Sequence, residues 1–372
     1  MKSNRNKPAR ILLTIPNFDS AGSGKVVYDL AKQIDKELFE VHIACSNDKG
    51  PFFKLVSALD VTIHITNTTC SYRPYISLPS KIFKIAGFFK KNHFDLIHSW
   101  HWSSDWTEPL AAKIAGIKWI YTKKAMSWGS PRNWKIRSRL ASFITTINPD
   151  MRKLYFNKFN NIRMLPLGLD TNYYSFQPKT FQYKEITFQQ NDFVIISVVN
   201  LIKSKGLEVL VDAMKFINEP TVKLLVVGDY SSEYGQHIFN KVKSENLDSR
   251  IIFTGKVLDV RSYIALADVF VTPTNVNWEG MPMAPVEAMA SGRIVIGTDT
   301  SGINFILDDF KDFLIPPNNP AAIAEKILMV KSMTPDKKNE LQWNYRRKAI
   351  DAFAVETFAT NYQKLYQELI NA

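Results

Sequence analysis

The sequence predicts an α/β protein built from two doubly wound parallel-sheet domains in tandem. Three observations support this fold class. Short apolar runs alternate with helical patterns, the alternation restarts after a polar interruption, and 372 residues suit two domains of about 150–200 residues each. The composition, 45% apolar and 22% charged residues, excludes a disordered, collagenous or coiled-coil chain.

The first half of the chain opens on the apolar run 11–16, which we interpret as a buried strand. A helix is expected at 22–34, where apolar residues recur at helical spacing. Further strands are expected at 41–45, 61–65, 95–99, 119–122, 144–147 and 164–167. Strands separated by helices indicate a parallel sheet, so residues 1–170 are predicted to form the first domain.

A polar and aromatic stretch at 171–191, containing Pro178, is interpreted as a linker. The second domain is expected over 192–352. Its predicted strands are 193–199, 223–227, 251–254, 269–272 and 294–297, and its predicted helices are 205–218, 232–246, 258–266 and 285–291. A terminal helix at 353–372 is expected to pack back on the first domain.

The net charge of +12 is unevenly distributed: residues 1–170 carry +14 and residues 171–372 carry −2. A basic half favours an anionic partner such as a membrane surface, a nucleic acid or a phosphorylated substrate. No apolar run approaches the ~18–20 residues of a membrane span, and the run 11–15 is too short for a signal-peptide core. With only two cysteines, Cys45 and Cys70, a reduced cytoplasmic protein is expected.

Ligands of open α/β sheets bind beyond the carboxyl ends of the strands, which selects four loops. The most informative is 277–292, where Glu279 lies in a loop and Glu287 follows eight residues later at the start of a helix. Glu287 could accept hydrogen bonds from a ribose and Glu279 from a sugar hydroxyl; the alternative is a solvated loop residue and a favourable helix-terminal charge. Backbone N–H groups that suit an anion are those of Gly280, Met281, Met283 and Ala284.

Two further loops contain phosphate-binding chemistry. Asn200-Leu-Ile-Lys-Ser-Lys-Gly206 places two lysines beside a glycine, which suits a diphosphate or is a surface charge pair. Gly22 and Ser23 belong to a small-residue loop that lets backbone amides approach a phosphate, or forms a tight turn. This loop is not a P-loop, because Val26 follows Lys25 where a Ser or Thr is required.

The fourth loop, 98–105, is rich in aromatic residues. Residues 100–134 hold six of the eight tryptophans. Aromatic rings stack on sugars and also lie at membrane interfaces. His101 could hydrogen-bond a sugar or phosphate or transfer a proton; the alternative is a packed aromatic cluster with a satisfied histidine.

Together these residues resemble the retaining glycosyltransferases of family 4, also called group 1. Members of that family have two Rossmann-like domains facing each other across a cleft, the GT-B architecture. The segment from Glu279-Gly-Met-Pro to Glu287-Ala-Met-Ala-Ser-Gly matches the family's Glu-x7-Glu signature and is specific. Individually weak matches, in family order over essentially the whole chain, are Gly22–Gly24, Leu165–Asp170, Val227–Asp229, Phe253–Gly255, Ala267–Thr274 and Leu314–Pro317.

The resemblance implies a transferase that uses a nucleotide-sugar donor and no metal or other cofactor. Glu287 would hold the ribose, Lys205 the diphosphate and Glu279 the donor sugar, with Val257 near the base. Catalysis would involve Glu279, Lys205 and His101, with the sugar's anomeric configuration retained. The other donor contacts would be Gly22, Ser23, Asn200, Gly280, Met281, Met283 and Ala284, and the acceptor contacts Trp100, His101, Trp102 and Ser103.

Three positions depart from the family pattern. Many members have Arg where this chain has Asn200, a His where one alignment places Ser103, and a Glu in the region of Asn304 and Phe305. Alternative functions are a nucleotide-sugar epimerase or hydrolase on the same fold, a non-catalytic sugar-binding protein, and a nucleic-acid-binding protein, for which no motif is present.

The segment 80–94 bears on the acceptor. As a helix it places Ile82, Ile85 and Phe89 on one apolar sector, with Lys81, Lys84, Lys90 and Lys91 on the flanks. This pattern suits either a stripe packed on the sheet with a solvated basic face, or an interfacial helix on an anionic membrane. We therefore expect a glycan or lipid-linked acceptor in cell-envelope polysaccharide, lipopolysaccharide or glycolipid biosynthesis, reached from the inner face of the membrane.

Overall fold

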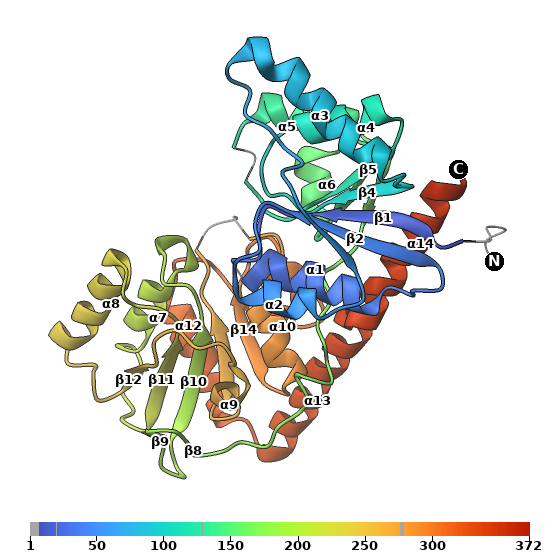
Figure 1. The fold of residues 1–372 in the computed structure, drawn as a ribbon. Helices are drawn as coiled ribbons and strands as arrows, with labels where there is room; N and C mark the ends of the chain where they lie inside the picture. Colours follow the sequence, from blue (N-terminus) through green and yellow to red (C-terminus); the bar gives the residue numbers. More distant parts are fainter. Residues whose placement is uncertain (1–6, 20, 128, 276–278) are drawn as a thin grey trace. The chain divides into compact units, whose positions relative to one another are not determined.

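The computed structural model describes residues 7–19, 21–127, 129–275 and 279–372, and it divides the chain into two compact units (Figure 1). Unit 1 comprises the chain up to Gly168 together with Val355–Ala372, and unit 2 comprises Leu169–Ala354. Each unit is a parallel sheet with helices on its faces.

Unit 1 contains a seven-stranded parallel sheet in the order β3-β2-β1-β4-β5-β6-β7. In this sheet Ile11 pairs with Val41 on one side and Leu96 on the other. The order reverses between β1 and β4, which makes this position the topological switch point where α/β sheets bind ligands. The strands are β1 (Ala9–Thr14), β2 (Phe39–Cys45), β3 (Thr62–Ile65), β4 (Leu96–Ser99), β5 (Lys118–Lys123), β6 (Phe143–Thr146) and β7 (Ile162–Met164).

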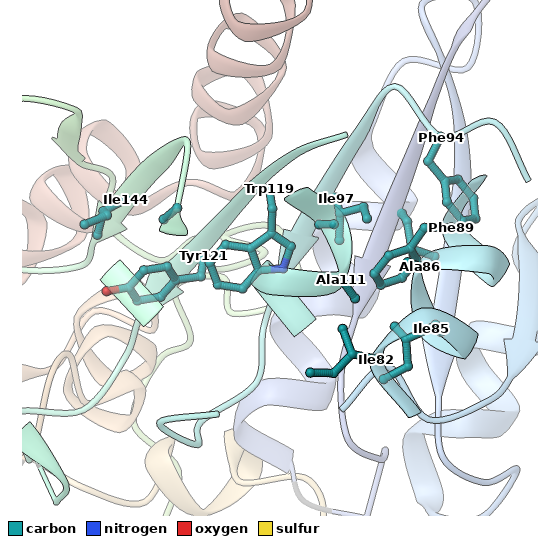
Figure 2. Close-up of a cluster of buried hydrophobic side chains, with 14 of the residues drawn as sticks. Ile82, Ile85, Ala86, Phe89, Phe94, Ile97, Ala111, Trp119, Tyr121 and Ile144 are labelled. Carbon is teal, nitrogen blue, oxygen red and sulfur yellow. The ribbon is translucent and has the colours of Figure 1, made fainter. Parts of the chain in front are cut away.

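The helices of unit 1 are α1 (Ala21–Gln33), α2 (Pro51–Ser57), α3 (Leu78–Lys91), α4 (Thr107–Ala115), α5 (Pro131–Leu140), α6 (Pro149–Tyr155) and α14 (Val355–Asn371), with a 3-10 turn η1 (Tyr75–Ser77) before α3. The apolar stripe of α3, including Ile82, Ile85 and Phe89, is buried against Ile97 and α4, as Figure 2 shows. The interpretation of this stripe as a sheet-packing face is therefore confirmed.

The terminal helix α14 packs on the sheet of unit 1. His98 Nδ1 lies 2.6 Å from the Tyr366 hydroxyl, and the Tyr362 hydroxyl lies 2.9 Å from Thr122 Oγ1. Aromatic side chains of α14 thereby fill the core next to β4 and β5.

Unit 2 contains a six-stranded parallel sheet in the order β12-β11-β10-β13-β14-β15, with its switch point between β10 and β13. Its strands are β10 (Phe193–Val198), β11 (Val222–Val227), β12 (Ile251–Phe253), β13 (Val269–Thr272), β14 (Ile294–Thr298) and β15 (Leu314–Ile315), and β8 (Gln182–Tyr183) and β9 (Ile186–Thr187) form a hairpin. Its helices are α7 (Leu207–Ala213), α8 (Glu233–Ser244), α9 (Arg261–Ile264), α10 (Met283–Ala290), α11 (Ile303–Ile306), α12 (Pro320–Ser332) and α13 (Pro335–Phe353), with 3-10 turns η2 (Lys203–Lys205) and η3 (Lys311–Phe313).

Several elements differ from the sequence expectation. The strand expected at 164–167 is β7 and ends at Met164, because Pro166 has no N–H to continue the ladder. The helix expected from Lys205 begins at Leu207, since Gly206 has the left-handed φ of +68°. Residues 171–191, expected as a linker, belong to unit 2, where Lys179 Nζ donates to Asp268 at 2.7 Å. Within the described ranges, no helix combines the length and the apolar character needed to cross a membrane.

Candidate functional site

The loops that follow β10 and β13 meet at the switch point of unit 2. The backbone N–H of Asn275 donates to the carbonyl of Ser204 at 3.2 Å, and its side-chain amide donates to the carbonyl of Lys203 at 3.1 Å. These bonds tie the lysine loop to the loop that leads into the Glu279 segment. The two loops that the sequence singled out for donor binding are therefore neighbours at one sheet edge.

Gly206 allows this close approach. Its φ is +68°, and a Cβ at this position would lie 1.9 Å from the carbonyl oxygen of Pro273. A side chain would separate the lysine loop from the loop after β13.

We expect Gly206→Ala to lower the free energy of unfolding by about 1–3 kcal/mol more than Gly116→Ala. Gly116 is the matched control, because its φ is +75° and a Cβ there would have no atom within 4 Å. Both variants share the left-handed backbone cost, so the difference reports the clash with Pro273. Urea unfolding followed by circular dichroism measures both; equal destabilisation would contradict the packing argument.

Lys205 and Glu279 form an ion pair between the two loops. The second carboxylate oxygen of Glu279 accepts from Thr274 Oγ1 at 2.9 Å. Thr274 is held in turn, because its carbonyl accepts from Thr298 Oγ1 at 2.5 Å. A cation and a carboxylate are thus fixed at the same sheet edge, where the first can neutralise a phosphate and the second can accept from a sugar hydroxyl.

Glu287 lies on α10, which begins just after the Glu279 loop, and its side chain is partly exposed. The hydroxyl of Tyr174 hydrogen-bonds the Glu287 carboxylate. Burial and the charge of Glu287 raise the pKa of Tyr174, so the phenol stays protonated and donates. The carbonyl of Tyr174 accepts from Arg346 at 3.1 Å, which holds the tyrosine in place.

Tyr174 is a site residue that the sequence analysis missed, because it lies in the stretch expected to be a linker. The preceding Tyr173 also belongs to this region. The guanidinium carbon of Arg261 lies 3.6 Å from the centroid of the Tyr173 ring, and the Tyr173 hydroxyl hydrogen-bonds Asp259. The signal that could have found them is the pair of adjacent tyrosines shortly after Asp170.

The remaining donor candidates of unit 2 lie on the same loops. Gly280 is buried beneath Gly302, where a Cβ would lie 2.5 Å from the Gly280 carbonyl oxygen, and Met281 is buried too. Asn277 and Trp278, which open the motif, lie outside the described residues. The structure places three candidates at partly exposed positions, namely Val257 after β12 and Met283 and Ala284 in the first turn of α10, and Asn200 is exposed after β10.

In unit 1, Gly22 and Ser23 lie in the first turn of α1, beside the switch point. Lys124, which follows β5, donates from Nζ to Ser23 Oγ at 2.7 Å and to the carbonyl of Trp100. Burial and the neighbouring charge of Arg137 lower the pKa of Lys124 to about 7. A Cβ at Gly22 would meet no atom within 4 Å, so packing does not require a glycine there.

His101 belongs to a buried hydrogen-bond chain. Its Nε2 lies 3.2 Å from Thr68 Oγ1, and Thr68 donates its hydroxyl proton to Glu108 at 2.7 Å. Thr68 has one hydroxyl proton, so its oxygen accepts from Nε2–H of His101. The chain therefore fixes the tautomer in which Nδ1 is the acceptor nitrogen. Burial lowers the pKa of His101 to about 4, so the ring is neutral at pH 7.

Glu108 and Arg137 anchor this chain and are both fully buried. Burial opposes ionisation of Glu108, but His101 and Arg137 together with the hydrogen bond from Ser99 keep the pKa of this carboxyl below its usual value. Ser99 donates to Glu108 at 2.6 Å and accepts from Arg137 at 3.0 Å. The guanidinium lies over three aromatic rings, those of Trp119, Tyr121 and Trp134.

His101 should make the stability of unit 1 depend on pH. Between its folded pKa of about 4 and its ordinary value of 6.5, only the unfolded chain binds the proton, so stability falls as the pH falls. Between pH 7 and pH 5, we expect the free energy of unfolding of the parent to fall by about 2 kcal/mol more than that of His101→Gln. Urea unfolding followed by tryptophan fluorescence measures this difference. The control variant is His237→Gln, which replaces an exposed histidine of unit 2. If the unfolding free energies of the parent and His101→Gln change in parallel with pH, the prediction is wrong.

The acceptor candidates after β4 divide into two kinds. Trp100 is fully buried, and its ring lies 6.4 Å from that of Phe358 and 5.7 Å from that of Tyr362. The prediction that Trp100 contacts the acceptor is therefore wrong for this structure, because α14 covers its ring. Trp102 is 49% exposed with Lys124 Nζ 5.5 Å from its ring centroid, and Ser103 is exposed.

Among the residues that the structure describes, no group of three or more His, Cys, Asp or Glu side chains is arranged to hold a metal ion. Cys45 and Cys70 are both thiols, and burial raises the pKa of Cys45 to about 11.

A family model described as "Glycosyl transferases group 1" matches residues 192–332, and one described as "Glycosyltransferase Family 4" matches residues 20–173. The chain is 24% identical, over 91% of both sequences, to an Escherichia coli UDP-Gal:alpha-D-GlcNAc-diphosphoundecaprenol alpha-1,3-galactosyltransferase.

Solved structures share the fold. A glycosyltransferase from Rickettsia africae superimposes with a TM-score of 0.84 at 19% identity, covering 98% of this chain and 99% of that one. The Anabaena protein HepE, solved in complex with UDP-glucose, superimposes with a TM-score of 0.77 at 18% identity, covering 96% and 99%.

Proposed function

Because the chain belongs to the group 1, family 4 glycosyltransferases and has their GT-B fold, we propose that it transfers a hexosyl residue from a uridine diphosphate sugar to a lipid-linked glycan of the cell envelope, with retention of anomeric configuration. The observation that carries the proposal is the Lys205–Glu279 pair between the two switch-point loops of unit 2, with Glu287 on the helix that follows. The choice of uridine diphosphate is supported by the HepE complex and by the name of the Escherichia coli relative.

The donor would lie along the carboxyl edge of the unit 2 sheet. Glu287 would accept from the ribose hydroxyls, Lys205 would approach the diphosphate, and Glu279 would accept from a hydroxyl of the sugar. The N–H groups of Met283 and Ala284, in the first turn of α10, would face the phosphate or the sugar. In the structure Lys205 and Glu279 neutralise each other, so donor binding would exchange this pair for two ligand contacts.

In the proposed reaction, the bond between the anomeric carbon and the diphosphate oxygen breaks. The acceptor hydroxyl oxygen bonds that carbon on the same face, and its proton passes to the leaving diphosphate. The charge that develops on the leaving group is stabilised by Lys205, and the protein's contribution is positioning and electrostatics. No metal or other cofactor takes part in this proposal.

On unit 1, the exposed side chains of Trp102 and Ser103 are proposed to contact the acceptor substrate. They are neighbours in the chain of His101, whose Nδ1 atom can accept a hydrogen bond. Gly22 and Ser23 are proposed to approach a phosphate of the donor, next to Lys124. A lipid diphosphate acceptor, which is anionic, agrees with the net charge of +14 on residues 1–170.

Thermal unfolding in the presence of nucleotide sugars tests the donor. A ligand at 100 times its dissociation constant stabilises the folded chain by about 2.7 kcal/mol, so the preferred donor should raise the melting temperature and sugars carried by other nucleotides should not. The anomeric configuration of the product, read by NMR coupling constants, tests retention. An inverted product would overturn the retaining mechanism, and the absence of stabilisation by every nucleotide sugar would overturn the donor site.

A further inference from the structure

An exposed stripe runs from η1 along α3, on the side of the helix opposite the core of unit 1. Ile76, Phe83, Gly87 and Lys90 recur at helical spacing, and all four are exposed. The opposite side of α3 carries the buried residues Ile82, Ile85, Ala86 and Phe89, which Figure 2 shows packed into the core. The exposed side of α3 therefore carries Phe83 and Lys90, with Ile76 of η1 just before the helix, and the sequence analysis identified only the buried apolar face.

Three large apolar side chains at the start of this stripe lie in water. Ile76 is 92% exposed, Tyr75 68% and Phe83 61%. In Figure 1, the start of α3 lies at an outer end of unit 1. A cluster of this kind on the surface marks a site of interaction with a partner.

The segment that presents these side chains is held in place. Lys81 Nζ donates to the carbonyl of Arg73 at 3.0 Å, and Ser77 Oγ donates to the carbonyl of Pro74 at 3.0 Å. The ring of Tyr72 stacks on Trp106 with centroids 5.3 Å apart. The fold thus fixes Tyr75 and Ile76 in an exposed position instead of folding them inward.

The same segment is cationic. Residues 71–94 contain five Lys and Arg and no Asp or Glu. Because Lys81 holds the loop carbonyls, the cations placed for a partner are Arg73, Lys84, Lys90 and Lys91, which are all exposed. Each lysine near an anionic bilayer contributes about fivefold to binding.

We propose that the η1–α3 stripe docks on an anionic lipid bilayer, with Tyr75, Ile76 and Phe83 entering the interface and Lys84, Lys90 and Lys91 meeting the headgroups. A bilayer offers an apolar phase and negative charge at the same place, which matches an apolar tip followed by cations. A nucleic acid would use the lysines but leaves Ile76 in water. That docking brings the chain to a lipid-linked acceptor rests on the proposed function; the docking itself does not.

The experiment is sedimentation of the full chain with vesicles that contain no acceptor, without any donor. Phosphatidylcholine vesicles containing phosphatidylglycerol should bind the chain at low salt, and vesicles of phosphatidylcholine alone should not. The combined variant Lys84→Gln, Lys90→Gln, Lys91→Gln should weaken binding about a hundredfold. The combined variant Ile76→Ser, Phe83→Ser should weaken it by about tenfold or more, at low and high salt alike.

Matched controls remove equal charge or apolar surface elsewhere. Lys153→Gln, Lys158→Gln, Lys337→Gln removes three exposed lysines, and Leu258→Ser removes a side chain that is 92% exposed in unit 2. Both controls should bind vesicles as the parent does. Donor-induced thermal stabilisation should be unchanged in all variants, so failure of the proposed function and failure of docking are read separately.

Three results would overturn the proposal. The first is a parent chain that does not sediment with anionic vesicles at low salt. The second is an Ile76→Ser, Phe83→Ser variant that binds anionic vesicles as tightly as the parent, which would make the surface a general polyanion site. The third is a parent dimer that this variant dissociates without any effect on vesicle binding, which would assign the stripe to a second copy of the chain.

Discussion

Lys205→Ala should lower kcat by a factor of about 10²–10³ while weakening donor binding much less. As the bond to the sugar breaks, negative charge collects on the diphosphate, so a cation beside it gains interaction in the transition state. In the unliganded chain that cation is held by Glu279, which is itself held by Thr274. Removing it leaves the carboxylate facing the place proposed for the sugar without its positive partner.

Steady-state turnover at saturating donor and a separate measurement of donor affinity distinguish the two effects. Lys203→Ala is the matched control, because Lys203 is an exposed lysine of the same loop whose backbone carbonyl, not its side chain, bonds Asn275. We expect its kcat to stay within a few-fold of the parent. If Lys203→Ala and Lys205→Ala lose turnover equally, the loop contributes only its summed charge, and the specific role of Lys205 is wrong.

The double variant Lys205→Ala, Glu279→Gln adds a sharper test. Residues that form one ion pair do not contribute additively, so the double variant should lose much less than the product of the two single losses. If the loss of turnover in the double variant equals the product of the two single losses, the pair does not act together in the reaction.

The sequence predicted the parts of the site that depend on local order along the chain. Alternating apolar runs located β10 and β13, and the rule that ligands lie beyond the carboxyl ends of parallel strands then selected the loops of Lys205 and Glu279. The contact between these loops follows from the sheet order, in which β10 and β13 are neighbours. Gly206, between the lysines and α7, allows the two loops to approach closely, because its φ is positive and Pro273 lies against it.

What the sequence did not predict depends on contacts between distant segments. Trp100 follows a strand that is buried on both faces, so alternation gave no direction for its ring, and the aromatic residues that cover it come from α14. Thr68 and Glu108 are 40 residues apart and meet only once β3 and β4 are arranged in the sheet. Tyr174 lies in an aperiodic stretch whose place in unit 2 depends on distant partners such as Arg346.

Glu287→Ala should raise the dissociation constant of the nucleotide-sugar donor by at least about tenfold, because it removes charge-assisted hydrogen bonds to the ribose worth about 1.5–3 kcal/mol each. The fold should persist, since Glu287 is partly exposed on α10 and the buried residues of that helix remain. Isothermal titration with the nucleoside diphosphate alone is the sharpest measurement, because it omits the sugar that Glu279 is proposed to contact.

Tyr174→Phe separates holding the carboxylate from contacting the ligand. The phenol of Tyr174 bonds Glu287, so its removal leaves the carboxylate charged but less fixed in direction. We expect the dissociation constant to rise by a smaller factor than in Glu287→Ala, and the double variant to bind no more weakly than Glu287→Ala alone, because Tyr174 acts through Glu287. If Glu287→Ala binds the nucleoside diphosphate as the parent does, the ribose assignment is wrong; if Tyr174→Phe weakens binding further in the Glu287→Ala background, the tyrosine contacts the nucleotide itself.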